Sequence, residues 1–409
     1  MDTDKKFGVC LYRTEEIFMQ LKKNSFLRIF LALCLTGVGL TGCGRPPQEP
    51  TAAPSATPSE LPQASGTVTV KDHADREVTV VQEPKRVVIT DIFPLASVLT
   101  VYLGSASSIV AMEPVSMNAA KNGILGQLYP EILNVDTSIM DGEDINVESI
   151  AALEPDVIFY NAGNAKEAEK FENAGLTAVG VSATGWNYDC LKTYDEWISL
   201  LDQIYPQHAH KNKLSTRVDE YGNAVYGAIQ ARVKNLDEQE KQKVLFLYRY
   251  DENTMITSGS NFFGQWWCDS IGAVNVAQDV SAENRNAVIT MEQVYAWNPD
   301  VIILTNFTPT QPEDLFANAI GGDDWSGIKA VQDRRVYKMP LGIYRTYTPG
   351  ADTPMTLEWL AQAVYPELFK DVNVRRDVAA YYKELYEITL TDEQIEAMYN
   401  PNSAVGSWQ

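Results

Sequence analysis

Histidine is scarce in this 409-residue chain, which has only His73, His208 and His210. A bare transition metal held in a cleft needs imidazole or thiolate ligands from both walls, and no histidine follows residue 210. His208 and His210 lie two residues apart, a spacing that does not place side chains together on a helix, so we expect them to be solvated. The sequence therefore predicts no direct metal site.

Three common enzyme motifs are also missing. The chain has no GxSxG, no GxxxxGK[ST] and no HExxH, the motifs that mark many serine hydrolases, P-loop NTPases and zinc proteases. An enzyme would need a nucleophile and a base that meet in a cleft. We expect no enzyme and no catalytic residue, although turnover of a bound ligand would reopen that alternative.

Basic residues are outnumbered, with 33 lysines and arginines against 54 aspartates and glutamates, for a net charge of −21. This sign argues against nucleic acid as a partner and against electrostatic adhesion to anionic lipid.

A secretion signal is predicted at the amino terminus. Lys22, Lys23 and Arg28 precede the apolar run 29–40, which is too short for the roughly 20 residues of a membrane-spanning helix. The run ends in Leu-Thr-Gly-Cys at Cys43, which resembles the lipobox of bacterial lipoproteins. We expect a signal peptide over 1–43 with its true start at Met19, and a lipid on Cys43. The alternative is an incidental cysteine within the signal.

The segment 44–66 is rich in proline, serine, threonine and alanine and has no apolar period, so we expect a disordered tether.

The stretch 146–160, NVESIAALEPDVIFY, recurs as 290–304, TMEQVYAWNPDVIIL. Each copy has a helix-capping residue, a glutamate two positions later, a Pro-Asp pair and then an apolar β-branched run. Proline disfavours helix for the residue before it, and a run apolar on both faces is typical of a parallel strand covered by helices. The repeat predicts two similar lobes, each with a short helix that leads into a buried strand.

The remaining pattern alternates strands with helices, which indicates an α/β fold with parallel sheets. A hairpin is expected within 67–90. The polar segment 206–242 carries apolar residues at steps of three and four, so we expect one long rigid helix between the lobes. The predicted organisation is two Rossmann-like lobes with parallel sheets: an amino-terminal lobe over 67–205, a bridging helix over 206–242 and a carboxyl-terminal lobe over 243–409, with closing helices at 377–388 and 392–399.

Aromatic residues and arginines follow several of the predicted strands. In an open α/β sheet the ligand lies beyond the carboxyl ends of the strands. Aromatic rings cover the organic face of a metal chelate, and guanidinium groups pair with its carboxylate, hydroxamate or catecholate oxygens. Many such aromatics pack in a core instead. The candidate ligand-binding residues are Phe93, Trp186, Tyr188, Arg249, Phe262, Trp266, Arg345 and Tyr347.

Glu148 and Glu292 occupy matching places in the two copies of the repeat. A glutamate at the start of a helix is favoured by the helix dipole, and that alone would account for both. Symmetric exposed glutamates, one in each lobe, would also suit docking to a two-fold partner.

Taken together, the lipobox, the tether, the repeat, GAVNVA (272–277), WSGIKAVQDRRVYKMP (325–340) and WLAQAVYPELF (359–369) resemble the substrate-binding lipoproteins of iron-siderophore, haem and cobalamin ABC importers. The resemblance covers roughly residues 67–370 in order. It implies a monomer on the outer face of the bacterial cytoplasmic membrane, or in a periplasm, that hands a metal complex to a permease dimer with its ATPase. It also implies that Glu148 and Glu292 pair with permease arginines.

The favoured ligand is an iron-siderophore or a similar metal chelate, with no cofactor on the protein. Haem, cobalamin and a molybdate-type oxyanion stay open as ligands, because cleft loops differ between members of this family. A non-transport surface lipoprotein on the same fold is a more remote alternative. The loop 342–353 goes beyond the general pattern and is expected to carry specificity.

Overall fold

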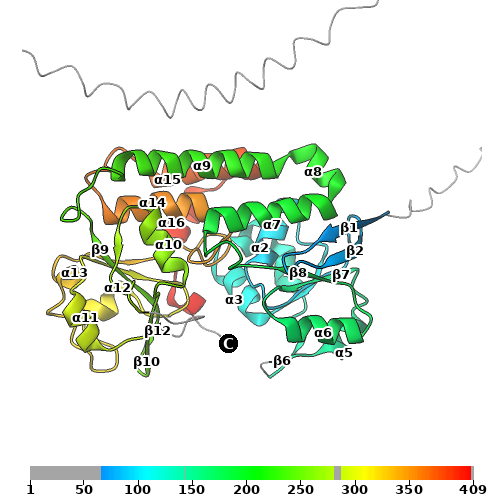
Figure 1. Cartoon of the computed structure of the whole chain (residues 1–409), viewed down its shortest axis with the longest axis horizontal. Helices are drawn as coiled ribbons and strands as arrows, with labels where there is room; N and C mark the ends of the chain where they lie inside the picture. Colours follow the sequence, from blue (N-terminus) through cyan, green and yellow to red (C-terminus); the bar gives the residue numbers. More distant parts are fainter. Residues whose placement is uncertain (1–65, 143, 281–286, 407–409) are drawn as a thin grey trace, which may run out of the picture. The chain divides into compact units, whose positions relative to one another are not determined.

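A computed structural model describes residues 66–142, 144–280 and 287–406 (Figure 1). All of them belong to one compact unit. The expected signal peptide, Cys43 and the tether up to residue 65 lie outside the described residues. Within the described part, we find no helix with the length and apolar character needed to cross a membrane.

The first half of the unit starts with the predicted hairpin and continues into a parallel sheet. Strands β1 and β2 pair antiparallel, and the next sheet has the order β4-β3-β7-β8 with every pair parallel. Its elements are β1 (Thr67–Lys71), β2 (Glu77–Val81), β3 (Val87–Ile89), α2 (Leu95–Leu103), β4 (Ile109–Met112), α3 (Pro114–Asn122), α4 (Leu125–Leu128), η1 (Pro130–Asn134), β5 (Met140–Asp141), β6 (Asp144–Ile145), α5 (Val147–Ala152), β7 (Val157–Asn161), α6 (Ala165–Asn173), β8 (Ala178–Val181) and α7 (Cys190–Ile204).

The second half contains a mixed sheet rather than the purely parallel one predicted. Strands β11, β9, β13 and β14 are parallel, while β10 folds back on β9 and pairs antiparallel with β12 at the edge. The elements are α8 (Pro206–Asn212), α9 (Leu214–Val233), β9 (Lys243–Asp251), β10 (Thr254–Thr257), α10 (Phe263–Ser270), β11 (Val274–Asn275), β12 (Ala287–Val288), α11 (Met291–Trp297), β13 (Val301–Leu304), α12 (Pro312–Phe316), α13 (Lys329–Gln332), β14 (Val336–Lys338), α14 (Thr353–Val364), α15 (Val374–Tyr386), α16 (Asp392–Tyr399) and η2 (Ser403–Gly406).

The Pro-Asp pair of the sequence repeat performs the same task in both halves. The carboxylate of Asp156 accepts hydrogen bonds from the backbone N–H groups of Lys85 and Arg86, at 2.7 and 2.9 Å, just before β3. The carboxylate of Asp300 accepts one from the N–H of Lys243, at 2.9 Å, at the start of β9. Each aspartate therefore fixes the parallel strand pair that follows, β3 with β7 and β9 with β13.

The predicted helix caps are also present. The side chain of Asn146 accepts a hydrogen bond from the N–H of Ser149, and Thr290 forms a reciprocal capping box with Gln293. These bonds satisfy backbone donors that the first turn of a helix leaves unpaired.

The single helix predicted over 206–242 is wrong. The chain instead forms α8, a break at Lys213 in the left-handed conformation (φ 49°, ψ 40°), and then α9, which ends at Val233. The apolar spacing that suggested one helix is real in α9, where Leu214, Val218 and Ile229 are buried. The break lies just before that spacing starts, and the hydrophobic pattern carries no signal for it.

The connection between the halves is a packed layer of helices rather than one rod. Helix α9 packs against α7 from the first half and α14 from the second, and α15 packs against both α9 and α14 (Figure 1). Helices α15 and α16 return to the first half, because Val378, Tyr382 and Ile395 belong to the same hydrophobic cluster as β3 and α2.

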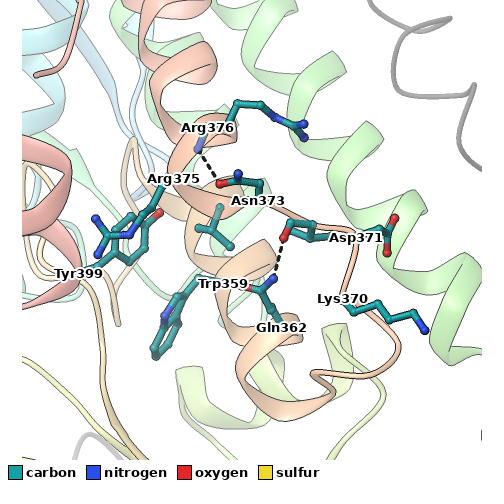
Figure 2. Close-up of a pocket in the computed structure, with 10 residues that line it drawn as sticks. Trp359, Gln362, Lys370, Asp371, Asn373, Arg375, Arg376 and Tyr399 are labelled. Atoms are coloured by element: carbon teal, nitrogen blue, oxygen red, sulfur yellow. Dashed lines mark hydrogen bonds between the residues drawn. The ribbon is translucent and has the colours of Figure 1, made fainter. Parts of the chain in front are cut away.

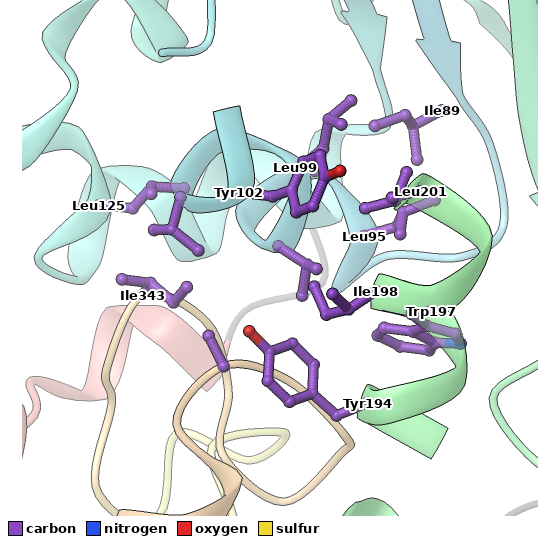
Figure 3. Close-up of a cluster of buried hydrophobic side chains, with 14 of the residues drawn as sticks. Ile89, Leu95, Leu99, Tyr102, Leu125, Tyr194, Trp197, Ile198, Leu201 and Ile343 are labelled. Carbon is purple, nitrogen blue, oxygen red and sulfur yellow. The ribbon is translucent and has the colours of Figure 1, made fainter. Parts of the chain in front are cut away.

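Loops of the second half also enter this core. Figure 3 shows Ile343 beside Leu125 of α4 and Tyr194 of α7, with further side chains of α2 and α7 around them. Trp197 is fully buried there and donates a hydrogen bond through Nε1 to the carbonyl of Ser182, at 2.7 Å. The two halves therefore share one core near the helical layer.

Replacing Lys213 with glycine tests the helix break. A left-handed residue other than glycine costs about 1–2 kcal/mol, so Lys213→Gly should raise the free energy of unfolding by about 1 kcal/mol in urea denaturation. Lys211→Gly, within α8, is the matched control and should lower it by about 1 kcal/mol. A loss of stability in Lys213→Gly would indicate a continuous helix at this point.

Candidate functional site

Aromatic side chains from both halves form one cluster where the carboxyl ends of the two sheets meet. Its buried members are Tyr248, Phe262, Phe263, Phe307, Tyr344 and Tyr347, and Phe93 and Tyr188 of the first half pack against them. We refer to these eight residues as the interlobe aromatic cluster.

The rings of the cluster contact one another closely. The ring of Tyr248 lies 5.4 Å from that of Phe262 and 5.1 Å from that of Phe307, measured between centroids. Tyr188 reaches across from the first half, with its ring 5.3 Å from Phe263 and perpendicular to it. Edge-to-face pairs of this kind are stabilising beyond the area they bury. The cluster is an apolar surface to which both halves contribute.

Three hydrogen bonds hold Tyr347 at the centre of the cluster. Its hydroxyl donates to Oγ of Ser258, at 2.6 Å, and accepts from the N–H of Gly264, at 3.1 Å. The indole of Trp267 donates to the Tyr347 carbonyl, at 3.0 Å. The pKa of Tyr347 is raised by burial.

Arg345 supplies a guanidinium at the edge of the cluster. Its carbon Cζ lies 4.9 Å from the ring centroid of Phe307, and its side chain is buried. Guanidinium groups over aromatic faces are attracted by the ring quadrupole. The site therefore combines aromatic rings with a desolvated cation.

The structure distributes the eight predicted ligand-binding residues unevenly. Phe93, Tyr188, Phe262 and Tyr347 lie in the cluster, and Arg345 lies beside it. Trp186 is half-buried and its ring contacts the ring of His73, at 4.9 Å. The remaining two, Trp266 and Arg249, are half-buried outside the cluster's buried set, and Trp266 stacks at its edge on Trp267, at 4.7 Å.

Carboxylates at the carboxyl ends of the first sheet were missed by the sequence reasoning. Asp91 follows β3 and donates its backbone N–H to Glu113, which follows β4, at 2.5 Å. Glu167 on α6 accepts a hydrogen bond from the hydroxyl of Thr90, at 2.9 Å. The available signal was position, since Asp91 and Glu113 come directly after apolar runs.

Burial changes the protonation of two of these carboxyls. Burial raises the pKa of Glu113 to about 7, and the charges of Asp91 and Glu167 act in the same direction. Burial likewise raises the pKa of Glu167 to about 7, helped by the charge of Asp91 and opposed by the hydrogen bond from Thr90. The first-half edge of the site can therefore hold protons near neutral pH.

A buried lysine fixes the loop after β13. Nζ of Lys338 donates to the carbonyls of Thr308 and Thr310, at 2.6 and 2.8 Å. Burial lowers the pKa of Lys338 to about 7. The hydroxyls of Thr308 and Thr310 both donate to the carbonyl of Tyr250, at 2.6 Å, so the loop is held from two sides.

Two cavities are bordered by residues outside the cluster. The larger, of about 550 Å³, is bordered by α14, α15 and the end of α16, and Figure 2 shows Trp359, Lys370 and Arg375 around it. Arg375 is ion-paired with Glu396, at 2.6 Å. The smaller, of about 280 Å³, lies along α7 and α9 and includes Trp266. None of the residues that border either cavity belongs to the interlobe aromatic cluster.

Among residues 66–142, 144–280 and 287–406, no three histidine, cysteine, aspartate or glutamate side chains are placed to hold a metal ion.

The repeated glutamates are both exposed. Glu148 lies in the first turn of α5 and Glu292 in the first turn of α11. The pKa of Glu292 is lowered by a hydrogen bond with the side chain of Thr290. Both carboxylates are available at helix starts in equivalent positions of the two halves.

The fold and this site define a two-lobed binding protein, and comparison with known proteins gives its family. The model of the periplasmic binding protein family matches residues 101–341, more than half of the chain. The chain therefore belongs to the periplasmic binding protein family. It is the extracytoplasmic substrate-binding component of an ABC transporter, not an enzyme, and it works with a permease and an ATPase.

Three relatives illustrate this membership. YvrC of Bacillus subtilis, an ABC transporter substrate-binding lipoprotein, is 24% identical over 348 residues, which cover 84% of this chain and 98% of YvrC. The crystal structure of a periplasmic solute binding protein from Veillonella parvula is 30% identical, has a TM-score of 0.70 and covers 82% of this chain and 97% of its own. The molybdate-binding protein MolA of Haemophilus influenzae is 24% identical over 338 residues, which cover 78% of this chain and 90% of MolA.

The raised pKa of Glu113 predicts a dependence of stability on pH. A carboxyl with a folded pKa of about 7 and an ordinary value of 4.5 stabilises the fold fully below pH 4.5, and this contribution is lost as pH rises to about 7. Glu113→Gln should reduce that loss by on the order of 1–3 kcal/mol, measured as the free energy of unfolding in urea at pH 4.5 and 7.5.

Glu131→Gln is the control for this measurement. Glu131 is exposed and its pKa is lowered by hydrogen bonds from its own backbone N–H and from that of Ala106, so its replacement should not flatten the profile. Equal pH profiles for the native protein and Glu113→Gln would contradict the assignment.

Proposed function

We propose that this chain captures an iron-siderophore or a similar metal chelate between its two halves and delivers it to an ABC permease. In this proposal the protein is held at the outer face of the cytoplasmic membrane by a lipid on Cys43. The single observation that carries the choice of ligand class is the interlobe aromatic cluster.

The cluster supports an organic ligand of some size. Rings of both halves, Tyr188 on one side and Phe262 and Tyr248 on the other, already contact one another, so separation of the halves would expose aromatic faces on both walls. Aromatic faces suit the conjugated or aryl groups of a chelate. The donor atoms of the chelator fill the coordination sphere of the metal, so the protein needs no metal ligands of its own.

Arg345 supports negative charge on that ligand. Its guanidinium is buried beside Phe307, and an anionic oxygen placed there would form a charge-assisted hydrogen bond in a water-poor site. Catecholate, hydroxamate and carboxylate oxygens all meet this requirement.

A molybdate-type oxyanion is the second candidate. The similarity to MolA over most of both chains favours it. An oxyanion is bound by N–H and O–H donors and gains little from aromatic rings, so the composition of the cluster favours the chelate. Haem and cobalamin would use the same rings and are therefore tested together with siderophores.

Tryptophan fluorescence distinguishes these ligands. Trp267 contacts the cluster through the Tyr347 carbonyl, so a coloured chelate bound there should quench its emission. We expect saturable quenching by a ferric catecholate or ferric hydroxamate, and none by molybdate. Saturation by molybdate alone would replace the chelate with an oxyanion, and a lack of response to chelates, haem, cobalamin and molybdate would contradict the proposal.

Two variants place the ligand within the site. Tyr188→Ala removes a ring that faces the second half and should weaken binding by about fivefold. Trp186→Ala, two residues away but in contact with His73, should change the affinity by less than about twofold. The opposite ranking would move the ligand to the His73 side of the loop.

Docking on the permease is proposed for Glu148 and Glu292. The double variant Glu148→Arg with Glu292→Arg should bind ligand normally, because both side chains are exposed at the starts of α5 and α11. It should abolish uptake of radioactive iron by cells that depend on this protein, because the charge reversal repels the permease arginines.

The control for docking reverses two other exposed glutamates, Glu169 on α6 and Glu313 on α12. This variant carries the same change of net charge and should retain uptake. Normal uptake by the Glu148 and Glu292 variant would refute the docking assignment.

A further inference from the structure

The carboxyl-terminal segment returns to the junction of the two halves. After α16, labelled in Figure 1, the described part of the chain ends in η2, which packs against α3 of the first half. We refer to residues 401–406 as the carboxyl-terminal strap. It follows residue 341, where the match to the family model ends.

The strap is bound to Arg345. The carbonyl of Val405 accepts hydrogen bonds from Nε and Nη2 of Arg345, at 3.2 and 2.7 Å. Val405 is fully buried, and so is the guanidinium that it contacts. The same guanidinium lies against Phe307 of the interlobe aromatic cluster. A neutral backbone oxygen of the protein therefore occupies the donors proposed for a ligand oxygen.

The strap also contacts the first half. Nδ2 of Asn118 on α3 donates to the carbonyl of Ala404, at 3.4 Å, and Nη2 of Arg345 lies 3.5 Å from Oδ1 of Asn118. Asn118 thus joins the strap and Arg345 from the opposite wall. Separation of the two halves must break at least one of these contacts.

Gly406 fixes the position of the strap on the second half. A Cβ at this position would lie 2.2 Å from the backbone N of Pro309 and 2.4 Å from the carbonyl oxygen of Thr308. That loop cannot yield easily, because Lys338 and the threonine hydroxyls hold it from both sides. A side chain at 406 would therefore displace the strap rather than the loop.

We propose that the carboxyl-terminal strap is an internal competitor for the ligand site, which must leave Arg345 before a ligand oxygen can reach it. This inference rests on the proposed function, since it takes Arg345 as the group that meets the ligand.

The chemistry of the two acceptors gives the strap a selective role. A guanidinium forms a charge-assisted hydrogen bond with either acceptor, but an anionic oxygen adds the attraction between opposite charges, which a neutral carbonyl lacks. A ligand whose catecholate or carboxylate oxygens carry net negative charge can displace the Val405 carbonyl, whereas a neutral ligand of the same shape gains nothing by doing so. The strap therefore discriminates against uncharged molecules that the aromatic rings alone would accept.

Gly406→Leu tests the competition without altering Arg345 or any ring. The probe is ferric tris-catecholate, which carries a net negative charge, and its binding is followed by tryptophan fluorescence. The variant should bind the probe about tenfold more tightly than the native protein, the equivalent of one charged hydrogen bond released from competition. Ala404→Leu is the matched control: it adds the same side chain to an exposed strap position and should leave the affinity unchanged.

Amide hydrogen exchange, followed by mass spectrometry, measures the seating of the strap without any ligand. Peptides that cover 401–406 should exchange slowly in the native protein and in Ala404→Leu, and rapidly in Gly406→Leu. Rapid exchange of these peptides in the native protein would refute the claim that the strap is bound in the absence of ligand. Equal affinity of native protein and Gly406→Leu, with the strap released in the latter, would overturn the competition and leave the proposed function intact.

The two proposals fail in distinguishable ways. Suppose that neither the native protein nor Gly406→Leu binds a chelate, while exchange shows the strap bound in the native protein and released in the variant. The chelate function is then wrong, and the strap has no such ligand to compete with. Binding by Gly406→Leu alone would support both.

Discussion

Hydrogen bonds among buried hydroxyl and carboxyl groups join the two halves behind the site, and the arrangement of the site depends on them. The hydroxyls of Tyr194 on α7 and Tyr386 on α15 lie 2.7 Å apart, and that of Tyr381 lies 3.1 Å from Tyr386. Tyr382 donates to Asp352, whose carboxylate also accepts the N–H of Ile343, at 3.0 Å. Burial raises the pKa of Asp352 to about 6. Such a network is specific when every member is paired, so it fixes helices of both halves and the loop that carries Arg345 in one arrangement.

This constraint places the carboxyl ends of the two sheets against each other. Parallel strands leave their functional loops at one edge, and here the edges of both sheets contribute to the same apolar surface. The two edges are not equivalent. The first carries Asp91, Glu113 and Glu167 close to the junction, and the second carries Arg345 and the loop held by Lys338. In the proposed binding mode, a ligand between the two edges meets carboxyl groups on one side and a guanidinium on the other, so charge as well as shape would set its orientation.

Local features were predictable from the sequence, and long-range ones were not. The repeat predicted both helix-to-strand units and their caps, because capping and Pro-Asp geometry depend on residues within a few positions of one another. The break at Lys213 was missed, because one left-handed residue leaves no trace in a hydrophobic pattern. Half of the predicted ligand-binding residues lie in the interlobe aromatic cluster, because the carboxyl ends of parallel strands lie at one edge of a sheet. Trp186 instead contacts His73. The strap was beyond prediction, because Val405 contacts Arg345 across a sequence separation of 60 residues.

Hydrogen exchange with a saturating chelate tests the central claim most directly, because it locates the ligand without assuming which residues bind it. If the ligand lies between the halves, amide protection should increase together in segments 183–189 and 341–347, one from each wall. Protection confined to 359–376, around the cavity of Figure 2, or to one half alone would contradict the account.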